Sequence, residues 1–411
     1  MDSPNASDNQ CSFCGRSREE AELLIAGQGA FICNQCASRA NEIVQEEFKA
    51  EAVSKAVAKA KLDDITAVSP KEIKHYLDAY VIDQDKAKKV LSVAIYNHYK
   101  RLKRIAEGEE VLVEKSNILL VGKTGTGKTL LAKSIAKKLN LPFTIVDATV
   151  FTEAGYVGED VESMLSRLLQ VCDYDVRAAE RGIVFIDEID KIARRSDNPS
   201  LTRDVSGEGV QQSVLKLLEG ADVLVPPQGG RKHPEQKLVK INTSQILFIC
   251  GGAFDGIEKK IASRINRASI GFANIALREA TDDDLLSFVQ SEDLLEFGLI
   301  PELIGRLPVL VHLNPLSEHA LRRILTEPKN ALIKQYQELF AMDDVDLVFE
   351  DEAIELIAQV AIKRGLGARG LRNICEKILL DWMFELPLKS KEKVLTVSAD
   401  HVTACLEDFA D

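Results

Sequence analysis

The stretch NILLVGKTGTGKTLL, residues 117–131, decides the fold of this chain. The apolar run at 118–121 predicts a buried strand, and a glycine-rich loop joins it to a helical pattern at 127–139. The loop GKTGTGKT, 122–129, has the G-x-x-x-x-G-K-[ST] spacing of a phosphate-binding loop. Because glycines let backbone N–H groups close around phosphates, we expect a nucleotide here.

The side chains of this loop have separate expected roles. Lys128 is expected to reach the β and γ phosphates of ATP, and Thr129 to ligate Mg²⁺. The predicted nucleotide-binding residues are Gly122, Lys123, Thr124, Gly125, Thr126, Gly127, Lys128, Thr129 and Leu130.

An acidic pair follows the apolar run of GIVFIDEID, residues 182–190. We expect Asp187 to bind magnesium and Glu188 to polarise the attacking water, a pairing that suits hydrolysis rather than nucleotide storage. Phosphoryl transfer also needs positive charge, for which Arg306 and Arg369 are candidates. Taken alone, either arginine is better explained as a surface residue of a helix.

Short β-rich runs alternate with helical patterns between residues 65 and 314. These runs are NILLV, FTIVDA, GIVFID, QILFIC and LPVLVHL, and their alternation predicts an α/β fold with a parallel sheet flanked by helices. After residue 315 the pattern is mostly helical, with possible strands at VDLVFE and KVLTVS, which predicts a small α+β lid domain. The expected organisation is a zinc-binding domain at 8–50, a linker at 51–64, a large ATPase domain at 65–314 and a small domain at 315–411.

Four of the eight cysteines lie within the first 36 residues. Cys11, Cys14, Cys33 and Cys36 form C-x2-C-x18-C-x2-C, a spacing typical of structural zinc sites. Four thiolates leave no open position for water, so Zn²⁺ is expected to fold this unit rather than to catalyse. Two disulfides are the alternative, and they are disfavoured inside a cell. The apolar residues of this unit exceed what so small a core needs, which suggests a face for self-association or a partner.

Composition limits the classes of function. The chain has 411 residues, 45% of them apolar, and a net charge of −12. The negative charge disfavours binding to a nucleic-acid backbone, and no apolar run approaches the roughly 20 residues of a membrane span. The first ten residues resemble neither a signal nor a transit peptide, so we expect a cytoplasmic protein with no nucleic-acid or membrane partner.

The ordered set of motifs resembles the ClpX family, the AAA+ unfoldase subunits of the Clp protease, over nearly the whole chain. The set comprises the cysteine unit, the phosphate loop, GYVGED, VFIDEIDK, RKH, IGF, GLIPELIGRLPV and GARGLR. The resemblance implies that Lys128 and Thr129 belong to Walker A, and Asp187 and Glu188 to Walker B. It further implies that Arg306 is a finger reaching a neighbouring subunit's nucleotide and Arg369 is a second sensor. Val81 and Ile82 would pack near adenine, in a homohexamer.

The resemblance also implies residues that contact other proteins. Tyr156 and Val157 match a pore loop that grips unfolding polypeptide, Arg203 matches a second pore loop, and Arg231, Lys232 and His233 match an entrance loop. Ile270, Gly271 and Phe272 match the tripeptide that docks on the Clp serine peptidase ring. Other implied partners are tagged protein substrates and adaptor proteins. Without the resemblance, a core tyrosine, a solvated basic turn and a small apolar cluster are the alternatives.

The sequence departs from the family pattern at three points. Lys123 stands where the family usually has an uncharged residue, and Asp83 replaces a usual glycine. A second lysine beside the phosphates is expected to tighten nucleotide binding, whereas Asp83 either weakens it or faces water. ILFICGGAF, 246–254, offers no asparagine or threonine at the strand end, so no first-sensor residue is assigned.

Two further functions remain open from the sequence. One is an AAA+ machine acting on nucleic acid through the zinc unit, against which the acidic balance argues. The other is a zinc adaptor whose ATPase switches partner binding, against which Glu188 and the two arginines argue. HslU-type unfoldases share the core but lack the four-cysteine unit.

Overall fold

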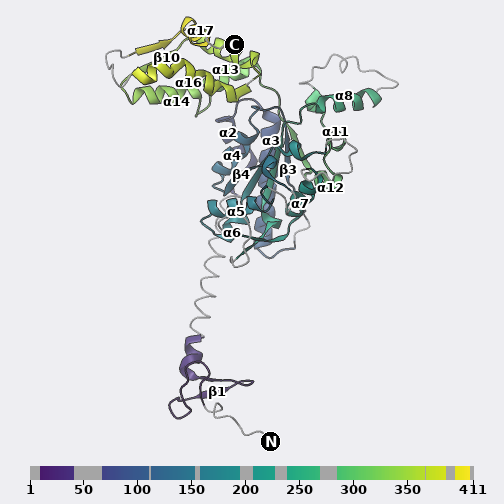
Figure 1. Ribbon diagram of the computed structural model, residues 1–411, viewed down its shortest axis with the longest axis vertical. Coiled ribbons are helices and arrows are strands. Elements are labelled where there is room, and N and C mark those ends of the chain that lie inside the picture. The colour runs from purple at the N-terminus through teal and green to yellow at the C-terminus, as the bar shows by residue number, and fades with distance from the viewer. Residues whose placement is uncertain are drawn as a thin grey trace. The chain divides into compact units, whose positions relative to one another are not determined.

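The computed structural model describes residues 10–40, 67–110, 113–152, 158–194, 207–226, 238–268, 285–365, 367–385 and 394–407 (Figure 1). The chain forms two compact units, Met1–Asp64 and Ile65–Asp411. Within the described ranges, every helix is too short or too polar to cross a lipid bilayer.

The first unit contains a small antiparallel hairpin. Strands β1 (Leu24–Ala26) and β2 (Phe31–Cys33) pair so that Leu24 lies opposite Cys33. Gly29 in the turn has a φ of +75°, a left-handed conformation that glycine adopts without strain. The hairpin ends at Cys33, whose backbone N–H donates to Cys11 Sγ at 3.2 Å, so it joins the two halves of the cysteine motif.

The second unit is built on a five-stranded parallel sheet with the order β4-β5-β8-β3-β9. Its strands are β3 (Ile118–Val121), β4 (Phe143–Asp147), β5 (Ile183–Asp187), β8 (Leu247–Gly252) and β9 (Val309–His312). β3 and β8 are buried along their whole length, because layers of helices cover both faces of a parallel sheet. The five strands predicted from the apolar runs are therefore confirmed.

Helices and short turns surround this sheet (Figure 1). The helices are α2 (Pro70–Asp78), α3 (Asp85–Ala106), α4 (Lys128–Lys138), α5 (Ser163–Val171), α6 (Val176–Ala179), α7 (Glu208–Glu219), α8 (Ile257–Ala268), α11 (Ser291–Phe297) and α12 (Pro301–Gly305). The 3-10 turns are η1 (Ala148–Val150), η2 (Ile189–Ile192), η3 (Thr243–Gln245) and η4 (Leu286–Phe288). A separate antiparallel hairpin is formed by β6 (Asp222–Val225) and β7 (Val239–Asn242).

The C-terminal elements have a hydrophobic core of their own, drawn in yellow-green in Figure 1. They are α13 (Glu318–Thr326), α14 (Leu332–Ala341), β10 (Asp346–Phe349), α15 (Asp351–Lys363), α16 (Gly367–Glu385), β11 (Val394–Val397) and α17 (Ala399–Glu407). β10 and β11 pair in parallel. This confirms the predicted small, mostly helical α+β domain with two strands, while the domain boundaries stay predictions.

Candidate nucleotide site and zinc centre

The phosphate loop lies between β3, the strand next to the sheet edge formed by β9, and helix α4. Gly125 and Gly127 have φ values of +84° and +101°, which non-glycine residues rarely adopt. A Cβ atom at Gly122 would lie 2.9 Å from the Cβ of Leu313, so this position also has no room for a side chain. The loop therefore depends on its glycines, as the motif predicts.

Lys128 is the first residue of α4, and only 8% of it is exposed. Its Nζ donates to the backbone oxygen of Gly122 and, at 3.1 Å, to that of Lys123. Burial lowers the pKa of Lys128, while Asp187 and Asp190 act in the opposite direction. An ammonium group held inside the loop by neutral carbonyls fits a site for phosphate, because an anion would supply the missing opposite charge.

Thr129 and Asp187 meet at the carboxyl end of the sheet. Thr129 Oγ1 donates to Asp187 Oδ2 at 3.0 Å, although the two residues are 58 positions apart. The pair thus offers a hydroxyl and a carboxylate side by side, and Mg²⁺ prefers such hard oxygen ligands. These residues fit the magnesium that accompanies ATP.

Glu188 follows β5 directly and is exposed. Its φ of +56° turns the chain sharply at the strand end, and its backbone N–H donates to Asp187 Oδ1 at 3.0 Å. Because of this turn, the two consecutive acidic residues face different surroundings. Asp187 lies beside Thr129, while Glu188 is open to water. This arrangement suits one acid for metal binding and one for polarising water.

Asp190 is a buried acid to which no sequence motif assigned a role. It is 6% exposed, accepts from the backbone N–H of Ala253 at 3.1 Å and pairs with Lys191 Nζ at 3.3 Å. A Cβ atom at Gly252 would lie 2.7 Å from Asp190 Oδ1 and 2.5 Å from the ring of Phe254. The end of β8 is therefore too crowded for a polar side chain at Gly252. The repeat of acids in IDEID was the only indication of Asp190 in the sequence.

Val81 and Ile82 lie in the turn between α2 and α3 and are 5% and 6% exposed. Both line a cavity of about 480 Å³ together with Arg323 of α13. Asp83, in the same turn, pairs with Arg323 at 2.8 Å rather than facing only water. The departure at this position therefore creates a link between the large domain and the small domain.

Arg369 lies in the first turn of α16 and is exposed. Its charge contributes to lowering the pKa of Lys128. The start of the helix is also close to the phosphate loop, because a Cβ atom at Gly367 would lie 3.3 Å from the backbone oxygen of Thr124. The structure thus brings Arg369 to the same side of the sheet as the Walker residues.

Arg306 lies at the opposite end of the sheet. Its guanidinium pairs with Glu219 at 3.2 Å, and both side chains are nearly half exposed. Its backbone oxygen accepts from Asn117 Nδ2 at 2.9 Å, which fixes it beside the residue that precedes β3. The phosphate loop begins at the other end of β3, five residues or roughly 16 Å away. Arg306 is therefore not brought together with the other nucleotide residues of its own chain.

The four N-terminal cysteines converge. Their Sγ atoms all lie within 4.8 Å of one another, and Cys14 and Cys33 are 3.7 Å apart. A Zn²⁺ ion with Zn–S bonds of about 2.3 Å needs sulfur atoms about 3.8 Å apart, so the cluster fits zinc. Each of these four cysteines is a thiol without a disulfide bond, which disagrees with the disulfide alternative.

Hydrogen bonds within the cluster separate the acidities of its thiols. Burial raises the pKa of Cys11, but backbone N–H groups of Cys33, Phe13 and Cys14 outweigh it and lower that pKa to about 6. Contacts with the thiols of Cys14 and Cys33 raise the pKa of Cys36 to about 12. Four thiolates cannot coexist here without a cation, so a metal would have to displace the protons.

The predicted protein-contacting residues lie outside the described residues. They are Tyr156, Val157, Arg203, Arg231, Lys232, His233, Ile270, Gly271 and Phe272. Described residues adjoin several of them: β6 and β7 flank 227–237, and Phe151 pairs with Glu159 on either side of 153–157.

Comparisons with known proteins agree with this geometry. Residues 9–46 match the family described as ClpX C4-type zinc finger, 113–310 match AAA domain (Cdc48 subfamily), and 316–399 match the C-terminal, D2-small domain of ClpB protein. A protein of Bacteroides thetaiotaomicron is 59% identical over 97% of this chain and 96% of its own length. A protein of Bacteroides fragilis is 59% identical over 97% of this chain and 95% of its own length. A protein of Porphyromonas gingivalis is 57% identical over 97% of this chain and 96% of its own length.

All three relatives carry the name "ATP-dependent Clp protease ATP-binding subunit ClpX". Both the AAA domain and the ClpX-type zinc finger are present in this chain, and the relatives span nearly all of it. The chain therefore belongs to the ClpX family, as an ATP hydrolase whose cofactors are ATP, Mg²⁺ and Zn²⁺.

Proposed function

We propose that this chain is the ATP-driven unfoldase of a Clp protease: a ring homohexamer that unfolds tagged proteins and threads them into the serine peptidase. The names of its relatives support the role of ATP-binding subunit of that protease. The position of Arg306, across the sheet from the Walker residues, carries the proposal that the active form is a ring.

Arg306 can serve ATP hydrolysis only from another subunit. It lies roughly 16 Å along β3 from its own phosphate loop, and the intervening strand is buried in the core. Its partner Glu219 is nearly half exposed, so the ion pair is weak and can open towards a neighbouring molecule. A site completed by a neighbour's arginine makes hydrolysis depend on assembly, which in a closed symmetric ring is satisfied at every interface.

The second part of the proposal assigns the grip on substrate to Tyr156 and Val157. Hydrogen bonds among the described residues on either side of 153–157 support this assignment, because they hold the two ends of that segment together. Thr152 N–H donates to the Glu159 backbone oxygen at 3.2 Å, and Glu159 N–H donates to that of Val150 at 3.2 Å. The Glu159 carboxylate also accepts from Arg167 at 2.7 Å. A tyrosine between glycines, on a short loop closed at its base, suits contact with any polypeptide sequence.

The remaining residues are assigned to entry and docking. Arg231, Lys232 and His233 follow β6 and precede β7, and their positive charge suits the free carboxylate of a substrate tail. Arg203 is assigned to a second pore loop. Ile270, Gly271 and Phe272 follow α8 and would anchor in a pocket of the peptidase ring. In the first unit, Phe13, Leu23 and Ile25 are exposed and are assigned to a face for adaptors or self-association.

Loss of native fluorescence tests the proposed unfolding directly. The substrate is a stable fluorescent protein with a ClpX-type C-terminal degradation tag, incubated with the full chain and ATP. We expect the wild type to extinguish fluorescence and Tyr156→Ala to hydrolyse ATP without doing so. Tyr174→Ala is the matched control, because Tyr174 is an exposed tyrosine outside the proposed pore. Equal unfolding by wild type and Tyr156→Ala would refute the pore assignment, and ATP turnover without any unfolding by wild type would refute the function.

A further inference from the structure

A second cavity, of about 630 Å³, lies between α3 and the edge strand β9. Its walls come from α3, from residues 113, 114 and 116, and from all four residues of β9. This volume falls within the roughly 300–1,000 Å³ range of small-molecule sites. No predicted nucleotide-binding residue lines it, so it is distinct from the ATP site.

The middle of the cavity is apolar. Val90 and Val93 project from α3 and are each 41% exposed, whereas Val113, 63% exposed, lies at the end that holds Arg101. Leu310 and Ala94 complete this part of the lining. Exposed valines around a concavity leave apolar surface in contact with water, and an apolar ligand would remove that cost.

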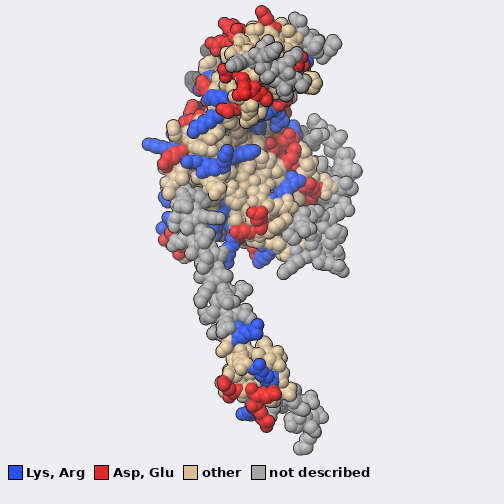
Figure 2. Space-filling view, turned by 90° about the vertical axis from the view of Figure 1, so that its left-hand side faces the viewer, with Lys and Arg blue, Asp and Glu red and all other residues tan. Residues whose placement is uncertain are grey.

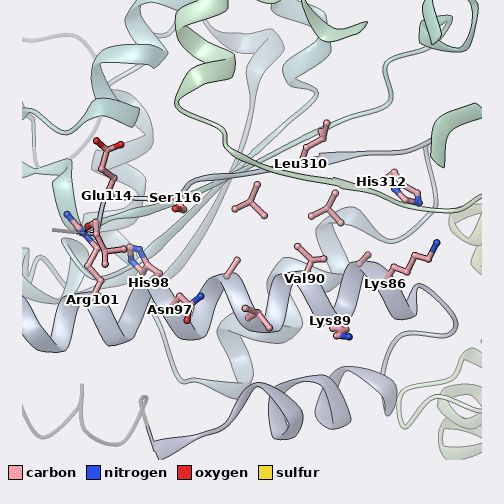
Figure 3. A pocket seen from close by; sticks show the side chains of 16 residues that line it. Lys86, Lys89, Val90, Asn97, His98, Arg101, Glu114, Ser116, Leu310 and His312 are labelled. Carbon is pink, nitrogen blue, oxygen red and sulfur yellow. Dashed lines mark hydrogen bonds between the residues drawn. The ribbon is translucent and has the colours of Figure 1, made fainter. Parts of the chain in front are cut away.

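His98, Arg101 and Glu114 lie at one end of the cavity, and Lys86, Lys89 and His312 at the other, as Figure 3 shows. His98 is 4% exposed, and its Nε2 lies 3.1 Å from the backbone oxygen of Gln245. Because a carbonyl oxygen only accepts, Nε2 carries the hydrogen and Nδ1 is an acceptor. Burial, aided by the charges of Lys115 and Arg101, lowers the pKa of His98 to about 3, so the ring stays neutral. Nδ1 has no hydrogen-bond partner in the structure.

Arg101 lies one helical turn from His98, at the same end of the cavity (Figure 3). Its Nε donates to the backbone oxygen of Val113 at 2.8 Å, while Nη1 is buried without a partner. In the described part of the chain, four buried side-chain polar atoms lack a partner, and two of them belong to this pair. An unpaired buried polar group is costly, so an open acceptor and an open donor at the same end of the cavity indicate a missing partner group.

We propose that this cavity binds a small amphipathic molecule whose apolar body lies between α3 and β9. Its polar head accepts a hydrogen bond from Arg101 Nη1 and donates one to His98 Nδ1. A primary carboxamide has both functions in one group. A carboxylate of the same skeleton can satisfy Arg101 but has no hydrogen for His98, and it would face the exposed Glu114 at that end of the cavity.

Three matched probes test the recognition of the head group: 4-phenylbutanamide, its N,N-dimethyl derivative and 4-phenylbutanoate. Their affinities for the full chain are measured by ligand-observed NMR titration in the presence of ATP. We expect the primary amide to bind about tenfold more tightly than either analogue, because each analogue leaves His98 unpaired. Equal affinities for all three, tighter binding of the carboxylate, or no saturable binding of the primary amide would overturn the proposal.

Variants locate the binding. Val93→Trp fills the middle of the cavity and should abolish saturable binding, whereas Val171→Trp changes a 55% exposed valine that does not line it. His98→Phe should remove the preference for the primary amide over its dimethyl derivative. If that variant fails to fold, the ¹⁵N shift of His98 Nδ1 in the wild type serves instead, since it must move on titration with the primary amide. An unchanged shift, or Val93→Trp binding as tightly as Val171→Trp, would refute the site.

Discussion

At the scale of single residues, the surroundings of two shielded lysines decide what each charge can do. Burial lowers the pKa of Lys128, but Asp187 and Asp190 nearby favour its charged form, and it is positioned to hold phosphate. Lys115 donates to the backbone oxygen of Thr243 at 3.0 Å, but burial and Arg101 lower its pKa to about 7. The first lysine is thus arranged for binding an anion, and the second loses its charge near neutral pH.

Lys115 gives a prediction about pH. Its folded pKa of about 7 lies below the ordinary value of about 10.4, so between these values the unfolded chain binds more protons and stability rises with pH. Lys115→Met should remove this rise in the free energy of unfolding, which is at most about 1.4 kcal/mol per pH unit. Urea unfolding at about pH 7.5 and about pH 9 measures it. Lys133→Met, an exposed lysine, is the control; the same pH slope in Lys115→Met and wild type would contradict the assignment.

Residue chemistry that depends on sequence neighbours could be predicted, whereas distant pairs could not. The sequence assigned roles to Lys128, Thr129, Asp187 and Glu188 because each motif also fixes the strand or helix end that presents it. The pairing of Asp83 with Arg323 joins residues 240 positions apart, and no local pattern relates them. Asp190 was missed for the same reason, because its role depends on Ala253 at the end of another strand.

At the scale of elements, the parallel sheet could be predicted because strands covered on both faces are continuous apolar runs. β3, β5 and β8 show this most clearly. The order β4-β5-β8-β3-β9 could not be obtained from those runs, since strand neighbours are set by how the helices pack. The order places β9 at an edge, and no pattern in the sequence indicates the cavity beside it.

The zinc unit gives the first prediction about an element. The β1–β2 hairpin has a small core, so metal binding should supply most of its folding free energy, on the order of 10 kcal/mol. Cys11→Ser or a strong chelator should abolish the hairpin's amide signals in NMR spectra, whereas Cys172→Ser should preserve them. ATP turnover should survive, because Ile65–Asp411 is a separate compact unit. A hairpin that persists without zinc would contradict a structural metal.

The segment after α8 gives the second prediction about an element. Phe272→Ala should leave ATP hydrolysis intact and reduce degradation by the chain with its peptidase at least about tenfold, because one aromatic anchor often dominates such an interface. Phe288→Ala is the matched control, since Phe288 is 44% exposed and lies outside the tripeptide. Undiminished degradation by Phe272→Ala would remove these residues from docking.

At the scale of the whole molecule, the chain holds all parts of an ATPase but not all in one place. The phosphate loop, Asp187, Glu188 and Arg369 gather at the carboxyl end of the sheet, while Arg306 lies at the amino end. A single copy can therefore bind nucleotide through its own Walker residues and present Arg306 to another copy. In the proposed ring, sharing of this kind would couple hydrolysis to assembly, on which the proposed unfolding depends.

Mixing two inactive variants tests this sharing most directly. Lys128→Ala lacks a working phosphate loop but keeps Arg306, and Arg306→Ala has the reverse defect. In an equal, randomly assembled mixture, about a quarter of the interfaces combine an intact phosphate loop with an intact arginine from the neighbour. Sharing of Arg306 between copies predicts that the mixture recovers about a quarter of wild-type ATP turnover while each variant alone is inactive. A mixture as inactive as its components, in rings shown to exchange subunits, would contradict it.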